Sequence, residues 1–423
     1  MEMYLNYGFG YQVLEVKENN LIQVLSLNPF PQLRNEEEEV RFALEHPMGT
    51  PRLRQIVKPG EKIVIVTSDI TRPMPTRKVL PLVMEELRVA GIKWGEIIVV
   101  LARGIHRPHT EREKRFLVGE EIYAQVEVRD SDLQDWVRLG TTRRGTPVEI
   151  YRPVAKADRR VCLGNIEYHY FAGYSGGAKA IMPGVSTRTA IQSNHRMMID
   201  PCSGPGEWEH NPVRQDIEEA IQFIPIDFIL NVVLDDQKQI VKAVAGHYQL
   251  AHREGCRFLD QLYKVEISSL ADIVITTPGG YPKDLSLYQA QKALDNAQHA
   301  VRTGGIIILV AACSEGLGDK VFERWMLTAQ HPEQMVEDIG RNFEIGGHKA
   351  AAIGKVMKKA RIFLVSEMDP LIVQRLFMQP FGEVNSALKQ AFKELGDVAG
   401  QVILMPAGSS TLPVLRHATK AGD

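Results

Sequence analysis

The amino-acid sequence predicts an α/β protein of two domains, each built on a largely parallel sheet flanked by helices. Short apolar runs rich in β-branched residues recur along the chain and end in turn residues. Continuous apolar runs of this kind are typical of strands that are buried on both faces of a parallel sheet. Segments with helical periodicity lie between these runs, which indicates a doubly wound arrangement. A chain of 423 residues is also longer than one hydrophobic core ordinarily accommodates, which favours more than one domain.

Each element follows from a local pattern. The predicted strands cover 62–67, 96–101, 160–163, 272–276 and 305–310, and the predicted helices cover 76–90, 252–263, 285–302 and 386–395. The helix over 76–90 has its apolar residues on one stripe and ends at Gly91, which suits the position after a helix. A fresh strand–helix–strand set begins at Asp272, so we expect a boundary near Val265 and domains of residues 1–264 and 265–423.

Composition excludes several classes of protein. The 50 basic and 52 acidic residues give a formal net charge of −2, which offers no electrostatic reason to expect nucleic acid as a partner. Cysteines at 162, 202, 256 and 313 form no C-x-x-C pair, so neither a zinc knuckle nor a disulfide framework is expected. No signal peptide is visible, and no apolar run approaches the roughly 20 residues that span a bilayer. We therefore expect a cytoplasmic protein without a membrane partner.

The segment 68–75, between a strand and a helix, carries the first candidate site residues. Asp69 or Thr71 fits an N-cap of the helix that follows. The alternative is an anion site at the helix start, in which Arg72 clamps a carboxylate or phosphate. The segment alone does not decide between these readings.

The segment 104–111 also follows a strand directly, and it carries His106 and His109 three residues apart. On a helix this spacing would favour a metal site, but Pro108 disfavours a regular helix that starts before it. An exposed histidine pair is usually without function, although the end of a strand raises the chance of a functional role.

The most informative segment, 164–184, follows the predicted strand over 160–163. It groups a histidine, a glycine-rich turn and a lysine, which are His169, Ser175-Gly176-Gly177 and Lys179, and His195 follows shortly after. Glycine permits close approach of the backbone to a ligand. The spacing differs from that of a Walker A loop. The alternative is that the segment is not a site, with the histidine hydrogen-bonded in the sheet and the lysine solvated.

A fourth segment begins at Gly279-Gly280. If Asp284 starts a helix, Tyr288 and Lys292 lie one turn apart on one face, with Gln289 beside Lys292. A phenol, an amide and an ammonium on one face suit the binding of a small polar acid. The alternative is the solvated edge of an ordinary amphipathic helix.

Together, these motifs resemble the nickel-dependent lactate racemase family. The resemblance runs through Asp69-x-Thr71-Arg72-Pro73, Gly104-x-His106-Arg107, His169, Ser175-Gly176-Gly177-x-Lys179, Pro183-Gly184, His195 and Tyr288-Gln289-x-x-Lys292. It extends from about residue 60 to about residue 320. Each motif alone is weak, but their order along the chain is highly specific.

The resemblance implies a cofactor and a role for each motif. The cofactor is a nickel pincer nucleotide, the nickel complex of pyridinium-3-thioamide-5-thiocarboxylic acid mononucleotide, attached covalently at Lys179, with His195 as the nickel ligand. Sulfur and imidazole donors suit square-planar nickel. His106 and His169 correspond to the acid/base pair. The implied cofactor contacts are Asp69, Thr71, Arg72, Ser175, Gly176 and Gly177, and the implied substrate contacts are Arg72, Tyr288, Gln289 and Lys292.

The implied activity is that of an isomerase, a racemase or epimerase of a 2-hydroxy acid such as lactate. Hydride would pass to and from the bound cofactor while two histidines on opposite sides of the substrate exchange its hydroxyl proton. The family implies that residues 1–264 bind the cofactor and that 265–423 add substrate contacts, with the active site in the cleft between the domains. It also implies cofactor-biosynthesis enzymes as partners.

The substrate and two alternative functions stay open. Family members that act on lactate can carry a tryptophan near 346–350, where this chain has Gly-Gly-His-Lys-Ala and its nearest tryptophan is Trp325. Malate, aryl, longer aliphatic and sugar acids are therefore candidates beside lactate. One alternative is a metal-dependent hydrolase that uses His106, His109 and Glu111. The other is a non-catalytic carrier of the nickel pincer cofactor.

Overall fold

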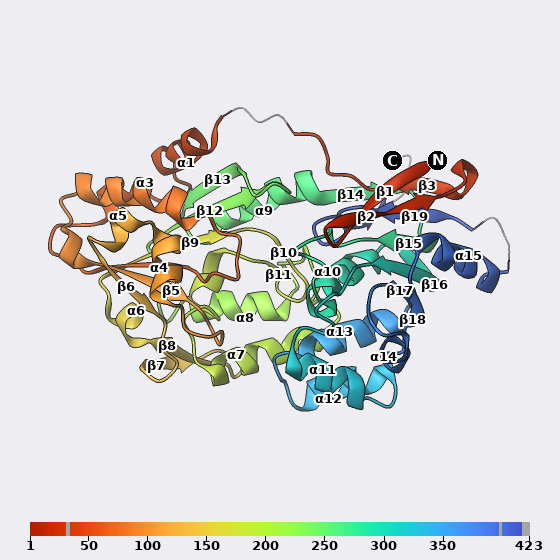
Figure 1. Ribbon diagram of the computed structural model, residues 1–423. Coiled ribbons are helices and arrows are strands. Elements are labelled where there is room, and N and C mark those ends of the chain that lie inside the picture. Colours follow the sequence, from red (N-terminus) through yellow and green to blue (C-terminus); the bar gives the residue numbers. More distant parts are fainter. Residues whose placement is uncertain (31–33, 397–399, 417–423) are drawn as a thin grey trace, which may run out of the picture. The chain divides into compact units, whose positions relative to one another are not determined.

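The computed structural model describes residues 1–30, 34–396 and 400–416 (Figure 1). These residues form two compact units. The central unit runs from Phe30 to Gln261, and the terminal unit combines Met1–Pro29 with the chain from Leu262 onward. In Figure 1 the red N-terminal hairpin accordingly belongs with the teal and blue elements.

The central unit contains a sheet in the strand order β13-β12-β9-β4-β5-β6. Its strands are β4 (Ile63–Ser68), β5 (Ile97–Ala102), β6 (Glu127–Asp130), β9 (Arg159–Asn165), β12 (Phe228–Leu234) and β13 (Ile240–Gly246). Neighbours pair in parallel except β12 with β13. The chain fills β4, β5 and β6 toward one side and then returns to place β9 and β12 on the other side of β4. In open α/β sheets, ligands bind at the carboxyl ends of the strands beside such a reversal.

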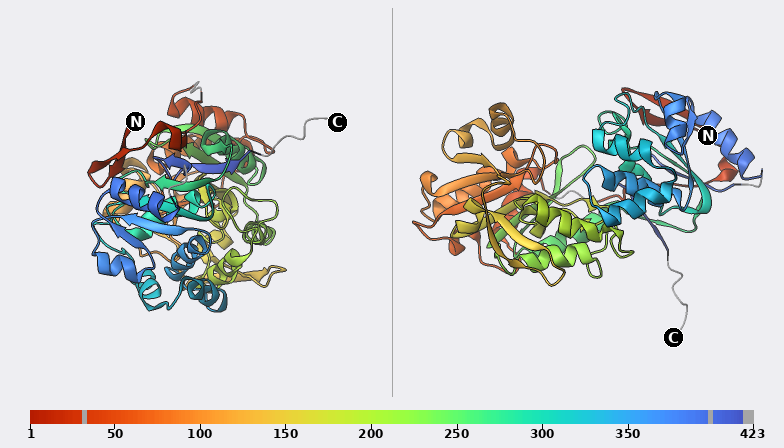
Figure 2. Two further views of the ribbon diagram at one scale, coloured as in Figure 1. Left: turned by 90° about the vertical axis from the view of Figure 1, so that its right-hand side faces the viewer. Right: turned by 90° about the horizontal axis from the view of Figure 1, so that it is seen from below.

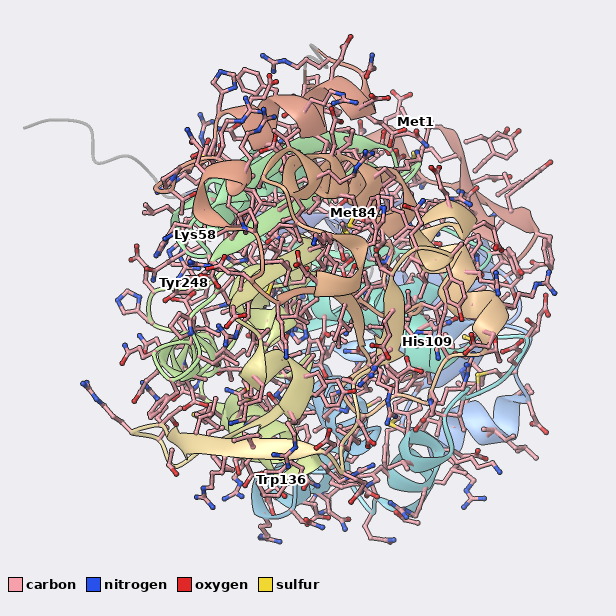
Figure 3. The ribbon with its side chains drawn as sticks, turned by 90° about the vertical axis from the view of Figure 1, so that its left-hand side faces the viewer. Met1, Lys58, Met84, His109, Trp136 and Tyr248 are labelled. Atoms are coloured by element: carbon pink, nitrogen blue, oxygen red, sulfur yellow. The ribbon has the colours of Figure 1, made fainter. Side chains whose placement is uncertain are left out.

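The central unit also contains helices that bury residues beside this sheet and against one another. The helices are α1 (Glu36–Glu45), α2 (Leu53–Ile56), α3 (Thr76–Val89), α4 (Glu111–Val118), α5 (Glu120–Tyr123), α6 (Arg152–Lys156), α7 (Arg188–His195), α8 (Pro212–Ala220) and α9 (Leu250–Tyr263). The apolar stripe of α3 is buried with Ile63 and Ile65 of β4 in one core cluster. A hairpin of β7 (Trp136–Thr141) and β8 (Pro147–Tyr151) lies beside the main sheet, with Trp136 labelled in Figure 3.

The terminal unit has a parallel sheet in the order β18-β17-β16-β15-β19-β3. Its strands are β3 (Leu21–Val24), β15 (Ala271–Thr276), β16 (Val301–Val310), β17 (Arg361–Val365), β18 (Gln379–Phe381) and β19 (Val402–Met405), with β14 (Lys264–Ile267) paired to β20 (Leu412–Leu415) and β1 (Glu2–Tyr7) paired to β2 (Gly10–Glu15). Its helices are α10 (Leu287–Ala297), α11 (Lys320–Thr328), α12 (Pro332–Arg341), α13 (Gly347–Met357), α14 (Pro370–Arg375) and α15 (Val384–Glu394). Figure 2 shows the blue helices and the red N-terminal hairpin around this sheet.

Alternate residues of these strands enter two different cores. Val274 and Ile307 face the core formed with α10 and α13, whereas Ile273 and Ile306 face the core completed by α15 and the β1–β2 hairpin. The N-terminal segment also supplies β3, which pairs with β19 at the sheet edge. Residues 1–29 therefore complete both a core and an edge of the terminal unit.

The fold class and most elements confirm the sequence prediction. All five predicted strands form, and so do the predicted helices over 76–90, 252–263 and 386–395. The helix predicted over 285–302 is shorter, because Val301 is fully buried and pairs with Ala271 at the start of β16. Asp284 does not start that helix. Its carboxylate accepts the backbone N–H groups of Gly8 and Ala312 instead.

The chain passes between the units twice, after Pro29 and before Leu262, whereas the sequence suggested a single boundary near Val265. Parts of the predicted domain 265–423, namely 397–399 and 417–423, lie outside the described residues. In the portion of the chain that the structure describes, no helix combines the length and apolar character needed to cross a membrane.

We predict that Leu25→Ala lowers the free energy of unfolding of the terminal unit by about 2–5 kcal/mol. Leu25 is fully buried in the core beside Val274 and Ile403, far from it in sequence. Ile22→Ala is the matched control, because Ile22 is 36% exposed on the same segment and should change stability by about 0.5 kcal/mol or less. Chemical denaturation measures both. Equal losses would contradict the packing of residues 1–29 described above.

Candidate active site

The predicted site residues of the central unit lie in loops that follow β4, β5 and β9. The ends of β4 and β5 are in register, with Ser68 opposite Ala102. The loops are also joined to one another, since the N–H of Gly104 donates to the carbonyl oxygen of Gly184 at 3.0 Å. Segments distant in sequence are therefore gathered at the carboxyl edge of one sheet.

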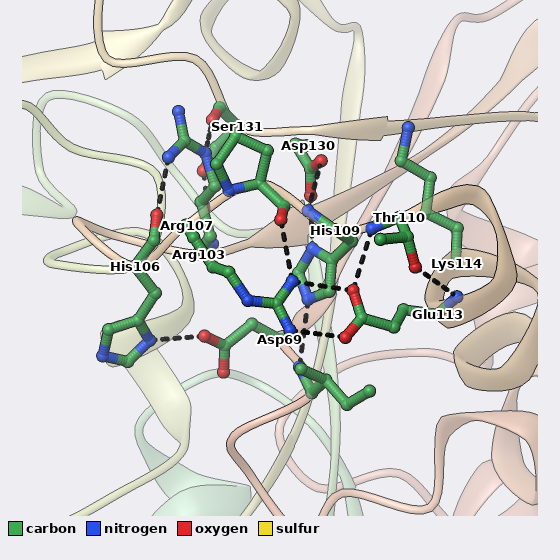
Figure 4. Close-up of polar contacts among 12 residues, drawn as sticks. Asp69, Arg103, His106, Arg107, His109, Thr110, Glu113, Lys114, Asp130 and Ser131 are labelled. Carbon is green, nitrogen blue, oxygen red and sulfur yellow. Dashed lines mark hydrogen bonds and ion pairs between the residues drawn. The ribbon is translucent and has the colours of Figure 1, made fainter. Parts of the chain in front are cut away.

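Asp69 and His106 form a close pair across two of these loops (Figure 4). Asp69 Oδ2 lies 2.5 Å from His106 Nδ1, and Thr71 Oγ1 donates to Asp69 Oδ1 at 2.7 Å. The Asp69 side chain is 3% exposed, whereas that of His106 is 45% exposed. Asp69 therefore does not cap the following helix, which starts after Pro75 without a side-chain cap. Its carboxylate orients the His106 ring.

The electrostatics of the pair fix its protonation. Burial by itself would raise the pKa of Asp69, but hydrogen bonds from His106 and Thr71 and the charge of Arg72 outweigh burial and hold that pKa below its usual value. An ionised carboxylate only accepts hydrogen bonds, so His106 Nδ1 carries a proton. In the neutral ring Nε2 is then the basic nitrogen, and it makes no hydrogen bond to any residue that the structure describes. A histidine in this state can accept a proton at Nε2.

His109 has a different role from His106. Its Nδ1 lies 2.5 Å from Asp130 Oδ1, and its Nε2 accepts the backbone N–H of Ile70 at 3.1 Å. His109 is buried and holds the loop that carries Asp69 (Figure 4). Glu111 pairs with Lys114 instead of turning toward the histidines. Among the described residues, no three His, Cys, Asp or Glu side chains are grouped to hold a metal ion. The three residues of the proposed hydrolase do not converge.

The turn Ser175-Gly176-Gly177 is packed tightly against its surroundings. Ser175 Oγ accepts the N–H of Glu167 and donates to the carbonyl oxygen of Asn165, so this hydroxyl closes the turn. Gly176 and Gly177 have positive φ angles of 73° and 59°. A Cβ atom on Gly176 would lie 2.8 Å from Asn231 Oδ1, and one on Gly177 would lie 2.9 Å from the ring of His252. Only glycine fits both positions without displacing a neighbour.

Lys179 follows this turn in a short 3-10 helix, Gly177–Ala180. Its ammonium group has no hydrogen-bond or ion-pair partner among the described residues and lies 5.9 Å from the centre of the Phe171 ring. Burial lowers the pKa of Lys179 well below its usual value, and the positive charges of Arg214 and Arg72 lower it further, opposed only in part by Glu167. The side chain is therefore suited to react as a neutral amine.

Phe171 brings three predicted site residues into one neighbourhood. Its ring centre lies 4.5 Å from that of His169 and 4.8 Å from that of His195, and the Lys179 contact is on the same ring. His169 lies in a small hairpin, in which β10 (Tyr168–His169) pairs with β11 (Gly173–Tyr174). His169 Nδ1 accepts the N–H of Ala172 at 3.2 Å, so the neutral ring carries its proton on Nε2. In their neutral forms, the two candidate acid/base histidines therefore differ at Nε2, where His106 has a lone pair and His169 has a proton.

Sequence comparisons identify the group of proteins to which these loops belong. Residues 7–206 match the family model of the lactate racemase N-terminal domain, and residues 267–412 match that of the lactate racemase C-terminal domain. The chain belongs to the lactate racemase family. Its relatives are isomerases, and the family predicted from the ordered motifs is confirmed.

Curated relatives and a solved structure agree with this assignment. A lactate racemase of Thermoanaerobacterium thermosaccharolyticum is 34% identical over 388 residues, covering 89% of this chain and 90% of the relative. A lactate racemase of Lactiplantibacillus plantarum is 31% identical over 384 residues, covering 88% and 90%. The structure of the lactate racemase apoprotein from Thermoanaerobacterium thermosaccharolyticum matches with a TM-score of 0.90 at 31% identity and covers 99% of this chain and 100% of that one.

The remaining predicted residues of this lactate racemase family member belong to two different units. Arg72 is 4.0 Å from Glu167, a partly exposed pair that links the loops after β4 and β9. Tyr288, Gln289 and Lys292 lie together on α10 in the terminal unit. Lys349 Nζ donates to the backbone oxygen of Tyr288 at 2.6 Å and lies 4.0 Å from the centre of its ring. A residue of the segment 346–350 therefore supports Tyr288. Substrate contact by this group, and the cleft between domains, remain predictions.

Several residues that shape the site escaped the sequence prediction. Phe171 reads as part of an aromatic run, and Asn231 lies inside a buried strand. Asp130 and His252 come from segments without a motif, although each holds a site loop through a hydrogen bond. A buried polar residue in an apolar strand was the signal available for Asn231. The partners of the other three depend on tertiary packing.

We predict that the Lys179 amine is acylated with a lower pH midpoint than an exposed lysine. A lowered pKa leaves more of the amine neutral, and the neutral amine is the nucleophile. The measurement is the acylation rate of unloaded protein from about pH 6 to 10, followed by peptide mass spectrometry, with exposed Lys58 as the internal control (Figure 3). Comparing the pH midpoints of the two lysines, instead of their absolute rates, corrects for the different access of the reagent to each amine. Coincident midpoints would contradict the proposed amine environment.

Proposed function

We propose that this protein racemises or epimerises a 2-hydroxy acid, lactate or a related acid, with a nickel pincer nucleotide attached at Lys179. The observation that carries the proposal is the Asp69–His106 pair, which leaves a basic Nε2 at the carboxyl edge of the sheet. Membership of the lactate racemase family supplies the reaction class. The named relatives are lactate racemases. Which 2-hydroxy acid this chain takes as its substrate belongs to the proposal.

The residues present fit the chemistry of that cofactor. A covalent link needs a reactive amine, and Lys179 has a lowered pKa and lacks an ionic partner among the described residues. The glycine turn before it presents backbone where any Cβ would collide with neighbours. His195 supplies an imidazole near the same Phe171 ring, and imidazole is a common nickel ligand. When bound, the cofactor would accept and return hydride at the substrate α-carbon.

The chain's own residues would then handle protons and orientation. His106 removes the hydroxyl proton of the substrate at Nε2, and the Asp69 carboxylate stabilises the imidazolium that forms. His169 presents an N–H at Nε2, which suits a hydrogen bond to the oxygen on the opposite side. A neutral ring does not give up its Nε2 proton near neutral pH, so His169 would pass a proton to the substrate oxygen only as the imidazolium, protonated at Nδ1 as well. That protonation would require release of the Ala172 amide by a small movement of this hairpin. Arg72 supplies a cation for the substrate carboxylate.

The surrounding proposals follow from the same assignment. Tyr288, Gln289 and Lys292 contact the substrate, and Thr71, Arg72 and the turn 175–177 contact the cofactor. The enzymes that synthesise the cofactor are the expected partners, in a cytoplasmic setting. A non-catalytic carrier would also need Lys179 and His195, but it would have no use for a basic His106 held by a buried carboxylate.

Loading and a substrate panel test the proposed function. Protein co-expressed with the cofactor-biosynthesis enzymes is examined by intact mass and nickel analysis, and then incubated with single enantiomers of chiral 2-hydroxy acids. We expect an adduct that Lys179→Met abolishes, and interconversion of at least one acid measured by chiral chromatography. Absence of both adduct and nickel would refute the cofactor assignment. Adduct and nickel with no interconversion across the panel would favour a carrier.

We predict that His106→Ala and His169→Ala each abolish interconversion, with a fall of about 10²–10⁴-fold or more, while the fold is retained. Asp69→Asn should also lower turnover strongly, because the amide no longer stabilises an imidazolium at His106. Steady-state kinetics with circular dichroism measure both properties. His46→Ala is the control, since His46 is exposed on the C-terminal end of α1. Unaltered turnover by either active-site variant would refute the two-histidine mechanism.

A further inference from the structure

A chain of buried hydrogen bonds runs behind His195, where α7 approaches α8. His195 Nδ1 lies 3.0 Å from Asn194 Oδ1. Asn194 Nδ2 donates to Asp216 Oδ2 at 2.8 Å and to the backbone oxygen of Val213 at 3.2 Å. Thr142 Oγ1 donates to Asp216 Oδ1 at 2.5 Å. Asn194 and Asp216 are fully buried, and Thr142 is 4% exposed.

The direction of these bonds follows from the chemistry of the groups. The backbone oxygen of Val213 can only accept, so the NH₂ group of Asn194 must face it. The carbonyl oxygen of Asn194 must then face His195. Because a carbonyl oxygen also only accepts, His195 Nδ1 must carry a proton and donate it to Asn194. In the neutral ring, Nε2 is therefore the nitrogen with the lone pair.

A purely structural role accounts for only part of this arrangement. Tying α7 to α8 requires the bonds from Asn194 to Val213 and Asp216. It does not require the remaining amide oxygen to be directed at the ring of the next residue. A buried amide and carboxylate are costly unless every group is satisfied, and a well-packed apolar pair would join the helices without that cost. The polar network is explained by what it does to His195.

We propose that Asn194, oriented by Asp216 and Thr142, is a positioning residue that fixes His195 in its Nδ1–H tautomer and presents Nε2 as the nickel-binding atom. The inference rests on the proposed function for the identity of the metal. Metal-bound histidines usually donate the other ring N–H to a fixed acceptor, and loss of that acceptor typically lowers metal affinity about 10- to 100-fold. The Asn194 oxygen is the acceptor in this chain.

The first test uses the unloaded protein, so it does not depend on the cofactor. Two-bond ¹⁵N–¹H correlation spectra of histidine-labelled protein report the tautomer of each ring, and the His195 signals are assigned by their absence in His195→Gln. We expect the Nδ1–H tautomer in the wild-type protein and a loss of that preference in Asn194→Ala. An unchanged tautomer in Asn194→Ala overturns the inference.

The second test measures nickel retention in the loaded protein. Intact mass counts the adduct at Lys179, and release of nickel to a chelator is followed over time. We expect Asn194→Ala to keep the adduct and to release nickel about 10- to 100-fold faster than the wild-type protein. Release at the wild-type rate overturns the inference. If the wild-type protein carries neither adduct nor nickel, the proposed function fails, and the tautomer measurement still decides the role of Asn194.

Two further variants separate positioning from general damage to the helices. Thr187→Ala removes the side chain that caps the other end of α7, where it accepts the N–H of Ala190, and it should leave tautomer and nickel release unchanged. The exchange Asn194→Asp with Asp216→Asn keeps an acceptor facing His195 and a donor between the two helices, and it gives up only the bond to the Val213 carbonyl oxygen. This double variant should restore the Nδ1–H tautomer and slow nickel release. Failure of the exchange to recover either property, when the protein is folded, counts against positioning.

Discussion

Burial of the Asp69 carboxylate at the carboxyl edge of the central sheet is the constraint on which the rest of the site depends. A buried charge must be matched by donors or neighbouring cations, because its transfer from water is costly. Thr71 and His106 provide the donors, and Arg72 contributes charge. The position of the His106 ring is thereby a consequence of satisfying Asp69. His109, paired with Asp130, accepts the backbone N–H of Ile70 and so anchors the residue next to Asp69 in the chain.

The loop after β9 is held by tight packing, whereas the loop after β4 is held by the charge of Asp69 and its partners. Gly176 and Gly177 lie so near Asn231 and His252 that a single added carbon would collide. The same neighbours bind the turn, since Asn231 accepts the N–H of Gly177 and His252 donates to the carbonyl oxygen of Ser175. Burial and nearby positive charge lower the pKa of His252, so this ring acts as a neutral donor. A turn fixed on both sides gives Lys179 a defined place behind Phe171.

The sequence predicted the parts of the site that are local and missed those created by packing. Strand ends, the glycine turn and the order of the motifs are local patterns, and they led to the correct fold class and family. The function of His109 was not predictable, because H-x-x-H spacing does not reveal that Asp130 will pair with one ring nitrogen and Ile70 with the other. The helix predicted to reach Arg302 ended early because Val301 joins a strand whose partner, Ala271, lies 30 residues earlier. Residues 1–29 likewise carry no sign that their core lies in the terminal unit.

Charge in the central unit explains why an electron-rich ligand suits these loops. Lys179 and Arg214 are both buried, and burial lowers the pKa of each. The charge of Arg214 lowers the pKa of Lys179 further. One terminal nitrogen of Arg214 is buried without a hydrogen-bond partner among the described residues. Glu167 opposes this pKa shift at Lys179, and Glu218 opposes it at Arg214. A ligand that brings negative charge or electron-rich donor atoms would offset the excess of positive charge around these loops, whereas a cationic ligand would add to it. An anionic substrate and cofactor, as proposed above, would therefore complement charges that the fold itself buries.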